Sequence, residues 1–172
     1  MKRTTHVLFA ITSLSLVLVA CGKKPEEAAA EAAIKAATGA DATVQHDGDA
    51  TTTSIKTKDG ELKIQSGEGL SLPADFPTDV YLPAGYEVKS MMNIGPMHNV
   101  VMEVAGDASS VSKEISGKME AGGWKTAMSM QTGSGSLLSF TRASDKRTAT
   151  YSLSPGQDGK LTLSLQQTAD MH

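Results

Sequence analysis

Alternation of apolar and polar residues dominates the second half of the chain. It recurs in six stretches, at residues 86–94, 98–105, 124–131, 136–142, 147–154 and 161–166. A period of two places every second side chain on the same face of a strand. Between the second and third stretches the period changes, because Val111, Ile115 and Met119 recur at intervals of four. That spacing predicts a helix that begins at Asp107 and ends near Gly122.

These segments predict the order β-β-α-β-β-β-β over residues 85–168. Short turns between successive strands require antiparallel neighbours, and one-sided alternation indicates that one sheet face is covered while the other meets water. We therefore expect an α+β domain, with one helix packed on one face of an antiparallel sheet. Methionine fills irregular cores where aromatic residues are few, so the predicted inward side chains include Met92, Met102, Met119, Trp124, Met128 and Met130.

A small β-meander is predicted over residues 41–71, ahead of this domain. Asp47-Gly48 and Asp59-Gly60 lie between runs rich in Thr, Val and Ile, and Asp-Gly favours a tight hairpin because glycine adopts positive φ. The sequence leaves open whether the meander extends the main sheet or forms a separate hairpin. Residues 72–84 contain three prolines and are predicted to form a rigid connector that holds Phe76, Val80 and Tyr81 against the domain.

The segment of residues 21–40 is rich in alanine and glutamate. These residues favour a helix, yet Ile34 is its one large apolar side chain. We expect a tether, either a marginal helix or a flexible spacer, with a docking helix for a partner as the alternative. Residues 169–172 are expected to be a tail.

Residues 1–20 have the pattern of an export signal. Lys2 and Arg3 precede an apolar run over residues 7–19, which is too short for a membrane-spanning helix. The run closes with Leu18-Val19-Ala20-Cys21, and in this tetrapeptide the chain resembles the lipobox of bacterial lipoproteins at each position. An ordinary secretory signal with an incidental thiol is the alternative.

The resemblance implies that the Cys21 sulfur carries diacylglycerol and that cleavage between Ala20 and Cys21 leaves an acylated N-terminus. Two or three acyl chains make a stable membrane anchor. The protein is then expected on the periplasmic side of a bacterial envelope. Gly22 stands where an aspartate would retain a lipoprotein at the inner membrane, which favours the outer membrane.

A weaker resemblance involves the mature domain. Phe76-Pro77, Asp79-Val80 and the later Gly122-Gly123-Trp124 resemble segments of small uncharacterised envelope lipoproteins that have a one-helix antiparallel domain. This resemblance covers roughly residues 72–167 and implies no activity.

The net charge and the single cysteine limit the classes of partner that the sequence favours. Removing residues 1–20 takes away Lys2 and Arg3 but no acidic residue, so the net charge falls from −3 to −5. Nucleic-acid binding calls for a basic patch, so no nucleic-acid partner is expected. Cys21 is the sole cysteine, which makes it an attachment point rather than a disulfide partner.

Motifs for catalysis or zinc binding are missing from the sequence. It has no His-x-x-x-His, Cys-x-x-Cys, Gly-x-Ser-x-Gly or P-loop pattern. We therefore predict a protein that is not an enzyme, has no cofactor beyond the lipid on Cys21, and uses its domain to contact an envelope protein. The second hypothesis is a ligand- or metal-binding module with Cu(I) at Met91, Met97 and His98, which requires these three to be exposed beside their turn. An enzyme with a site built from distant residues is the third.

Overall fold

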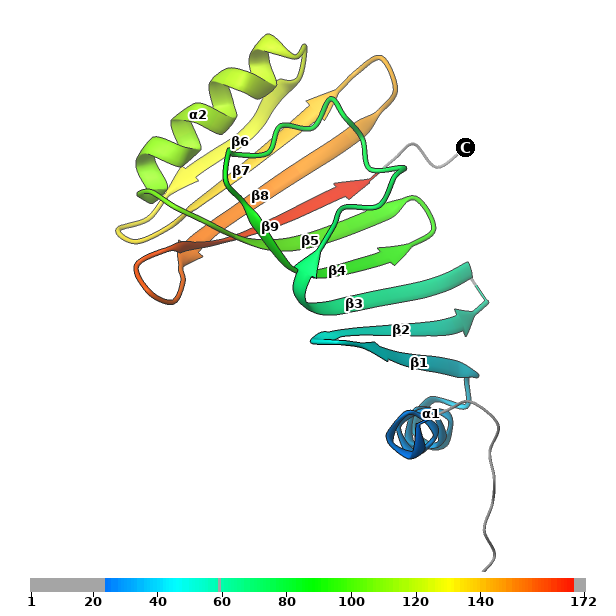
Figure 1. Ribbon diagram of the computed structural model, residues 1–172. Coiled ribbons are helices and arrows are strands. Elements are labelled where there is room, and N and C mark those ends of the chain that lie inside the picture. Colours follow the sequence, from blue (N-terminus) through cyan, green and yellow to red (C-terminus); the bar gives the residue numbers. More distant parts are fainter. Residues whose placement is uncertain (1–23, 59, 169–172) are drawn as a thin grey trace, which may run out of the picture.

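The computed structural model describes residues 24–58 and 60–168, which form two helices and nine strands (Figure 1). In chain order these are α1 (Pro25–Thr38), β1 (Ala42–Asp47), β2 (Ala50–Thr57), β3 (Gly60–Leu70), β4 (Glu87–Ile94), β5 (Met97–Val104), α2 (Ala108–Ala121), β6 (Lys125–Gln131), β7 (Ser136–Arg142), β8 (Arg147–Pro155) and β9 (Leu161–Thr168).

All nine strands belong to one antiparallel sheet, in the order β1-β2-β3-β4-β5-β9-β8-β7-β6. The pairing of β3 with β4 joins the predicted meander to the rest, so the meander extends the main sheet. Residues 85–168 contain β4, β5, α2 and β6–β9, as predicted for that segment. The whole fold differs from the prediction in two ways: α1, expected as a marginal helix or a spacer, packs against β1, and α2 contacts mainly the β6, β7 and β8 end of the sheet.

The core lies between the sheet and a cover made of α2 and the connector (Figure 1). Asp107 begins α2 by accepting a hydrogen bond at 2.9 Å from the Ser110 amide, as its position predicts. The apolar stripe of α2 is buried, and so are Phe76 and Val80 of the connector. The inward strand positions of β5, β7, β8 and β9 complete this core.

A β-bulge changes which methionine of β4 is buried. Val88 pairs with Met102 but Ser90 pairs with Val101, so Lys89 is an extra residue in the strand. One inserted residue switches the face of every side chain that follows. Met91 is accordingly 2% exposed and Met92 38% exposed. The prediction that Met92 faces the core was wrong for this reason.

A second bulge has the same effect on β6. Thr126 pairs with Phe140 and Met128 with Ser139, which leaves Ala127 as the inserted residue. Trp124, ahead of the bulge, is buried as predicted. Met128 and Met130, beyond it, are 48% and 50% exposed, so their predicted place in the core was also wrong.

We call the sheet surface opposite α2 the open face. Its central strands carry half-buried hydroxyl side chains on this face, Ser139, Thr150 and Ser164, and the exposed amide of Gln166. Apolar side chains from the β2–β4 region lie on the open face as well, because Ile64 is in register with Met92. The sheet therefore buries one face at its α2 end and partly buries the other at its α1 end.

The two neighbouring methionines of β4 test the bulge. Met91→Ala should lower the free energy of unfolding by about 2–5 kcal/mol, because it empties space in the core. Met92→Ala should change it by less than about 0.5 kcal/mol. Urea denaturation followed by tryptophan fluorescence measures both. Equal losses in the two variants would show that the bulge is absent.

Candidate functional site

The predicted lipidation site lies just ahead of the folded structure. Ala20 and Cys21 are outside the described residues, which begin at Lys24. Lys24 is the third residue after Cys21, and an extended chain spans at most about 3.6 Å per residue. The start of α1 at Pro25 is therefore held within roughly 15 Å of Cys21, whatever path the intervening residues take.

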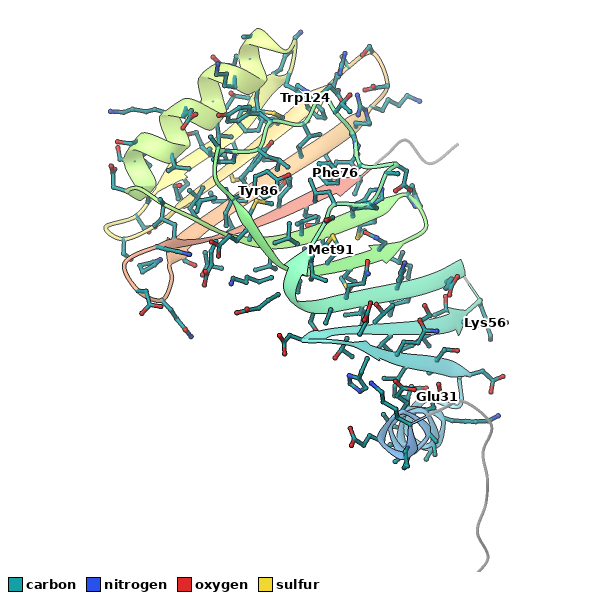
Figure 2. The ribbon with its side chains drawn as sticks, in the orientation of Figure 1. Glu31, Lys56, Phe76, Tyr86, Met91 and Trp124 are labelled. Atoms are coloured by element: carbon teal, nitrogen blue, oxygen red, sulfur yellow. The ribbon has the colours of Figure 1, made fainter. Side chains whose placement is uncertain are left out.

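Helix α1 lies along the outer edge of β1 and is attached by glutamate side chains (Figure 2). Glu27 Oε1 accepts a hydrogen bond at 3.0 Å from the backbone N–H of His46. One helical turn later, Glu31 Oε1 accepts a hydrogen bond at 2.9 Å from the N–H of Val44. Lys24 Nζ donates to the carbonyl of His46 at 3.3 Å. Backbone groups of an edge strand that lack a strand partner are thus bonded to helix side chains.

Electrostatics at this seam favour the docked helix. The hydrogen bond from the His46 N–H is the main reason that the pKa of Glu27 lies below its ordinary value, so the carboxylate stays ionised. At the other end of α1, Lys35 pairs with Asp41 at 2.7 Å, which lowers the pKa of Asp41. The predicted tether thus contains a helix fixed to the sheet. In the sequence this docking is indicated only by Glu27 and Glu31, whose spacing of four residues places them on the same side of a helix.

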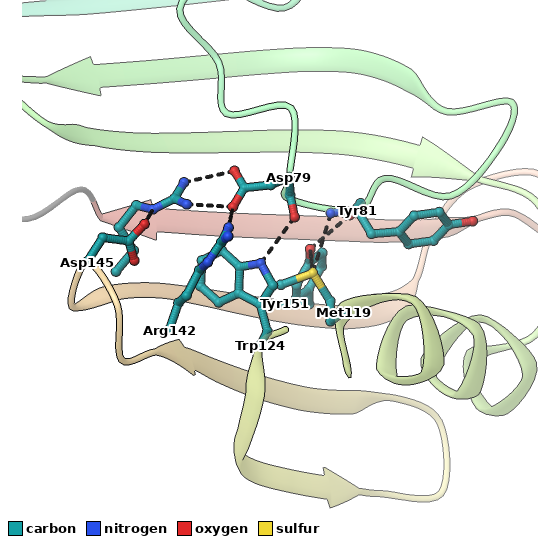
Figure 3. A network of polar contacts seen from close by, with 8 residues as sticks. Asp79, Tyr81, Met119, Trp124, Arg142, Asp145 and Tyr151 are labelled. Carbon is teal, nitrogen blue, oxygen red and sulfur yellow. Dashed lines mark hydrogen bonds and ion pairs between the residues drawn. The ribbon is translucent and has the colours of Figure 1, made fainter. Parts of the chain in front are cut away.

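A polar network, which we call the clasp, fixes the connector to the far end of the sheet (Figure 3). Asp79 of the connector accepts hydrogen bonds from Arg142 of β7 and from Arg147 of β8, the latter through Nη1 at 2.9 Å. Asp145 binds the Nε of Arg147 at 2.7 Å. The Trp124 ring lies against both guanidinium groups, at 5.9 and 5.3 Å, and its Nε1 donates to the Asp79 carbonyl at 3.1 Å.

Two carboxylates and two guanidinium groups balance the formal charge of the clasp, and one oxygen, Asp145 Oδ1, is buried without a hydrogen-bond partner among the described residues. Hydrogen bonding from Arg147 is the main cause that holds the pKa of Asp79 below its usual range. Next to the clasp, the Tyr151 hydroxyl donates to the Tyr81 carbonyl at 2.8 Å, and burial raises the pKa of Tyr151. A hydrogen bond to Glu114 raises the pKa of Tyr81 to about 12. Both tyrosine hydroxyls therefore stay protonated at neutral pH, whereas Asp79 stays ionised. Together these groups hold the connector in place.

The three candidate copper ligands do not come together. Met91 and His98 lie on the core side of the sheet and are 2% and 9% exposed, whereas Met97 is on the open face. The Nδ1 atom of His98 is 3.0 Å from the Asn93 amide oxygen, and its ring packs edge-on against Phe76. The exposure that a copper site at the turn requires is thus missing at two of the three residues.

Two further properties concern residues 24–58 and 60–168 alone. Within them, His, Cys, Asp and Glu side chains form no group of three or more that could hold a metal ion. Neither α1 nor α2 is long and apolar enough to cross a membrane.

Comparison of the chain with protein-family models, with curated proteins and with solved structures finds no match. The site therefore has to be interpreted from its own geometry.

The edge contact of α1 can be tested with two adjacent glutamates. Glu27→Ala should make the His46 amide exchange its hydrogen faster, because that N–H loses its acceptor. Glu26→Ala is the matched control, since Glu26 is exposed and equally close to the helix start. Hydrogen–deuterium exchange with residue resolution measures both, and equal protection in parent and Glu27→Ala would contradict the docking contact.

The clasp predicts a pH-dependent stability difference. Asp79→Asn should cost about 1–3 kcal/mol at neutral pH, since it weakens charge-assisted bonds that are partly buried. The folded-state pKa of Asp79 is lowered, so its contribution is present above the unfolded value of about 3.9 and is lost as the pH falls through the folded value. The parent and the variant should therefore converge below about pH 4.

Denaturant titrations at pH 7 and at pH 3 measure this difference. Asp75→Asn serves as control, because Asp75 is an exposed acid of the same connector. A difference between parent and Asp79→Asn that stays constant across this range would show that the effect does not come from the ionised carboxylate.

Proposed function

We propose that this protein is a lipid-anchored, non-enzymatic component of the bacterial envelope that presents its sheet domain to protein partners close to the membrane. The single observation that carries the proposal is the lipobox ending at Cys21, only a few residues before the docked helix α1. The anchor lies on the periplasmic side, in the outer membrane rather than the inner one, because Gly22 is not an aspartate.

Docking of α1 supports a position near the membrane surface. If residues 25–38 were a free spacer, the domain could move several nanometres from its anchor. Instead, Glu27 and Glu31 tie this segment to β1, so the lipid is joined to the β1 edge of the sheet. Neighbouring strands are about 4.8 Å apart, which places β6 up to about 38 Å from the anchored edge. The anchor thus orients the sheet as well as retaining it.

Confinement gives such a protein a mechanism without catalysis. A protein held at a surface meets other membrane-bound proteins at a raised effective concentration, so weak contacts are sufficient. The clasp is consistent with this reading, because its ionisable groups bind one another and fix the connector. Turnover of a substrate by the purified chain, abolished by one substitution, would overturn the non-enzymatic part of the proposal. The copper hypothesis gains no support from the placement of its three residues.

Cys21→Ser tests the anchor directly. The parent should be found in the membrane fraction, with an acylated N-terminal residue at position 21. The variant lacks the thiol that receives the lipid, so it should keep residues 1–20 and show no acyl mass. Intact-mass spectrometry of the purified chains gives the answer, and an acylated Cys21→Ser product, or a parent without acyl mass, would contradict the proposal.

Gly22→Asp is the matched variant for sorting. It keeps the thiol, so acylation should be unchanged, and we expect the protein to move from the outer-membrane to the inner-membrane fraction. Density-gradient separation of the two membranes measures this. A lipidated parent already in the inner membrane would contradict the outer-membrane assignment while leaving the anchor intact.

A further inference from the structure

The two edges of the sheet differ in how they are protected. The β1 edge is covered by α1, whose glutamates accept hydrogen bonds from the Val44 and His46 amides. At the opposite edge, all seven residues of β6 are exposed. An uncovered edge strand offers backbone donors and acceptors to another strand.

The exposed apolar side chains of the described residues concentrate at this second edge. Within residues 24–58 and 60–168, three large hydrophobic side chains are exposed. Two of them, Met128 and Met130, belong to β6. Both project from the open face, beside Leu137 of β7, which is in register with Met130. Next to Met130 is a cavity of about 250 Å³, lined by Met130, Leu137 and Leu153 together with hydroxyl side chains of β7, β8 and the β6–β7 turn. The edge thus combines free backbone groups with an apolar strip.

We propose that β6 pairs with β6 of a second copy of this chain, antiparallel across a two-fold axis at Ser129. This interface is independent of the lipid anchor. A two-fold axis normal to the sheet keeps the open faces of both copies on the same side, so paired residues must project from the same face. Centred on Ser129, the pairing sets Met128 of each copy opposite Met130 of the other. The thioether side chains are then cross-strand neighbours and leave water together.

Charge fits this self-pairing. Lys125 is the one charged residue of β6, and it lies in the half of the strand that precedes the bulge at Ala127. With the axis at Ser129, the two Lys125 residues are about 26 Å apart along the paired strands, so they do not repel each other at contact range. The regular segment, Met128–Gln131, carries no charge that would oppose pairing.

Protection of the other edge limits the assembly to two copies. Each copy brings one free edge, β6, and one covered edge, β1. Pairing through β6 consumes both free edges, so the combined sheet ends in an α1 helix on each side and cannot grow further. The strand interface is small, and we expect a dissociation constant on the order of micromolar.

The experiment uses the full chain solubilised in detergent. Sedimentation velocity over a concentration series should show a monomer–dimer equilibrium for the parent. Replacing both Met128 and Met130 by Glu sets like charges opposite each other, which should raise the dissociation constant by about tenfold or more. Met92→Glu is the matched control, being an exposed methionine on the same face but away from the edge, and should dimerise like the parent.

Two further variants determine the register. The double variant Met128→Lys, Met130→Lys, mixed with the double variant Met128→Glu, Met130→Glu, should restore dimers as mixed pairs. Ser129→Cys should form an intermolecular disulfide on mild oxidation, because directly opposed residues have Cα atoms about 4.5–5.5 Å apart, within disulfide range. Met92→Cys, and the parent with Cys21 as its only thiol, are the blanks for this reaction.

A parent that stays monomeric at every concentration overturns the proposal. So does a dimer that the Glu pair leaves unchanged, which locates the interface elsewhere, or a Ser129→Cys chain that crosslinks no faster than Met92→Cys. None of these results depends on whether Cys21 carries lipid, which the acyl mass of the parent decides separately.

Discussion

Backbone hydrogen bonding at the edges of an open sheet is the constraint on which this structure depends. Nine strands in one sheet leave two outer strands with groups that need partners. At β1 the need is met by α1, which has little apolar surface and attaches through Glu27 and Glu31. A 14-residue helix with a single large apolar side chain, Ile34, would be marginal alone in water. It is ordered because the edge strand supplies donors for its carboxylates, and the edge is closed because the helix supplies acceptors.

The second constraint is that one sheet has two faces and only one layer of cover. Helix α2 covers the end formed by β6, β7 and β8, and the connector covers the adjoining part of that face, where Phe76 packs against His98. The connector forms no strand with the sheet, and its three prolines have no backbone donor, so side chains fix it in place. In the clasp, the Asp79 carboxylate binds two arginines from neighbouring strands. The backbone carbonyl of Asp79 accepts a hydrogen bond from Trp124. The buried Phe76 and Val80 depend on that attachment for their position.

Sequence patterns predicted the element types and most of the inward positions, because hydrophobic periodicity reflects burial directly. They failed where the period is interrupted. One inserted residue in β4 and one in β6, Lys89 and Ala127, reverse the faces of Met92, Met128 and Met130. A bulge leaves the alternation of residue types intact on each side, so only the partner strand reveals it. The docking of α1 was not predicted for another reason. Hydrophobic periodicity marks a helix that buries an apolar face, and α1 binds through glutamates instead. The predicted lipidation site rests on the sequence alone, since Cys21 lies ahead of the described residues.

The contacts between α1 and β1 have two consequences. Because the helix begins close to Cys21 and binds the β1 edge, any anchor at that residue is coupled to the orientation of the sheet. The same contacts close β1 to other strands, so β6, at the opposite end of the sheet, is the outer strand whose edge is uncovered. A flexible spacer at residues 25–38 would separate these two properties. Here they are joined, so loss of the α1 contacts would both lengthen the link between Cys21 and the sheet and expose a second strand edge.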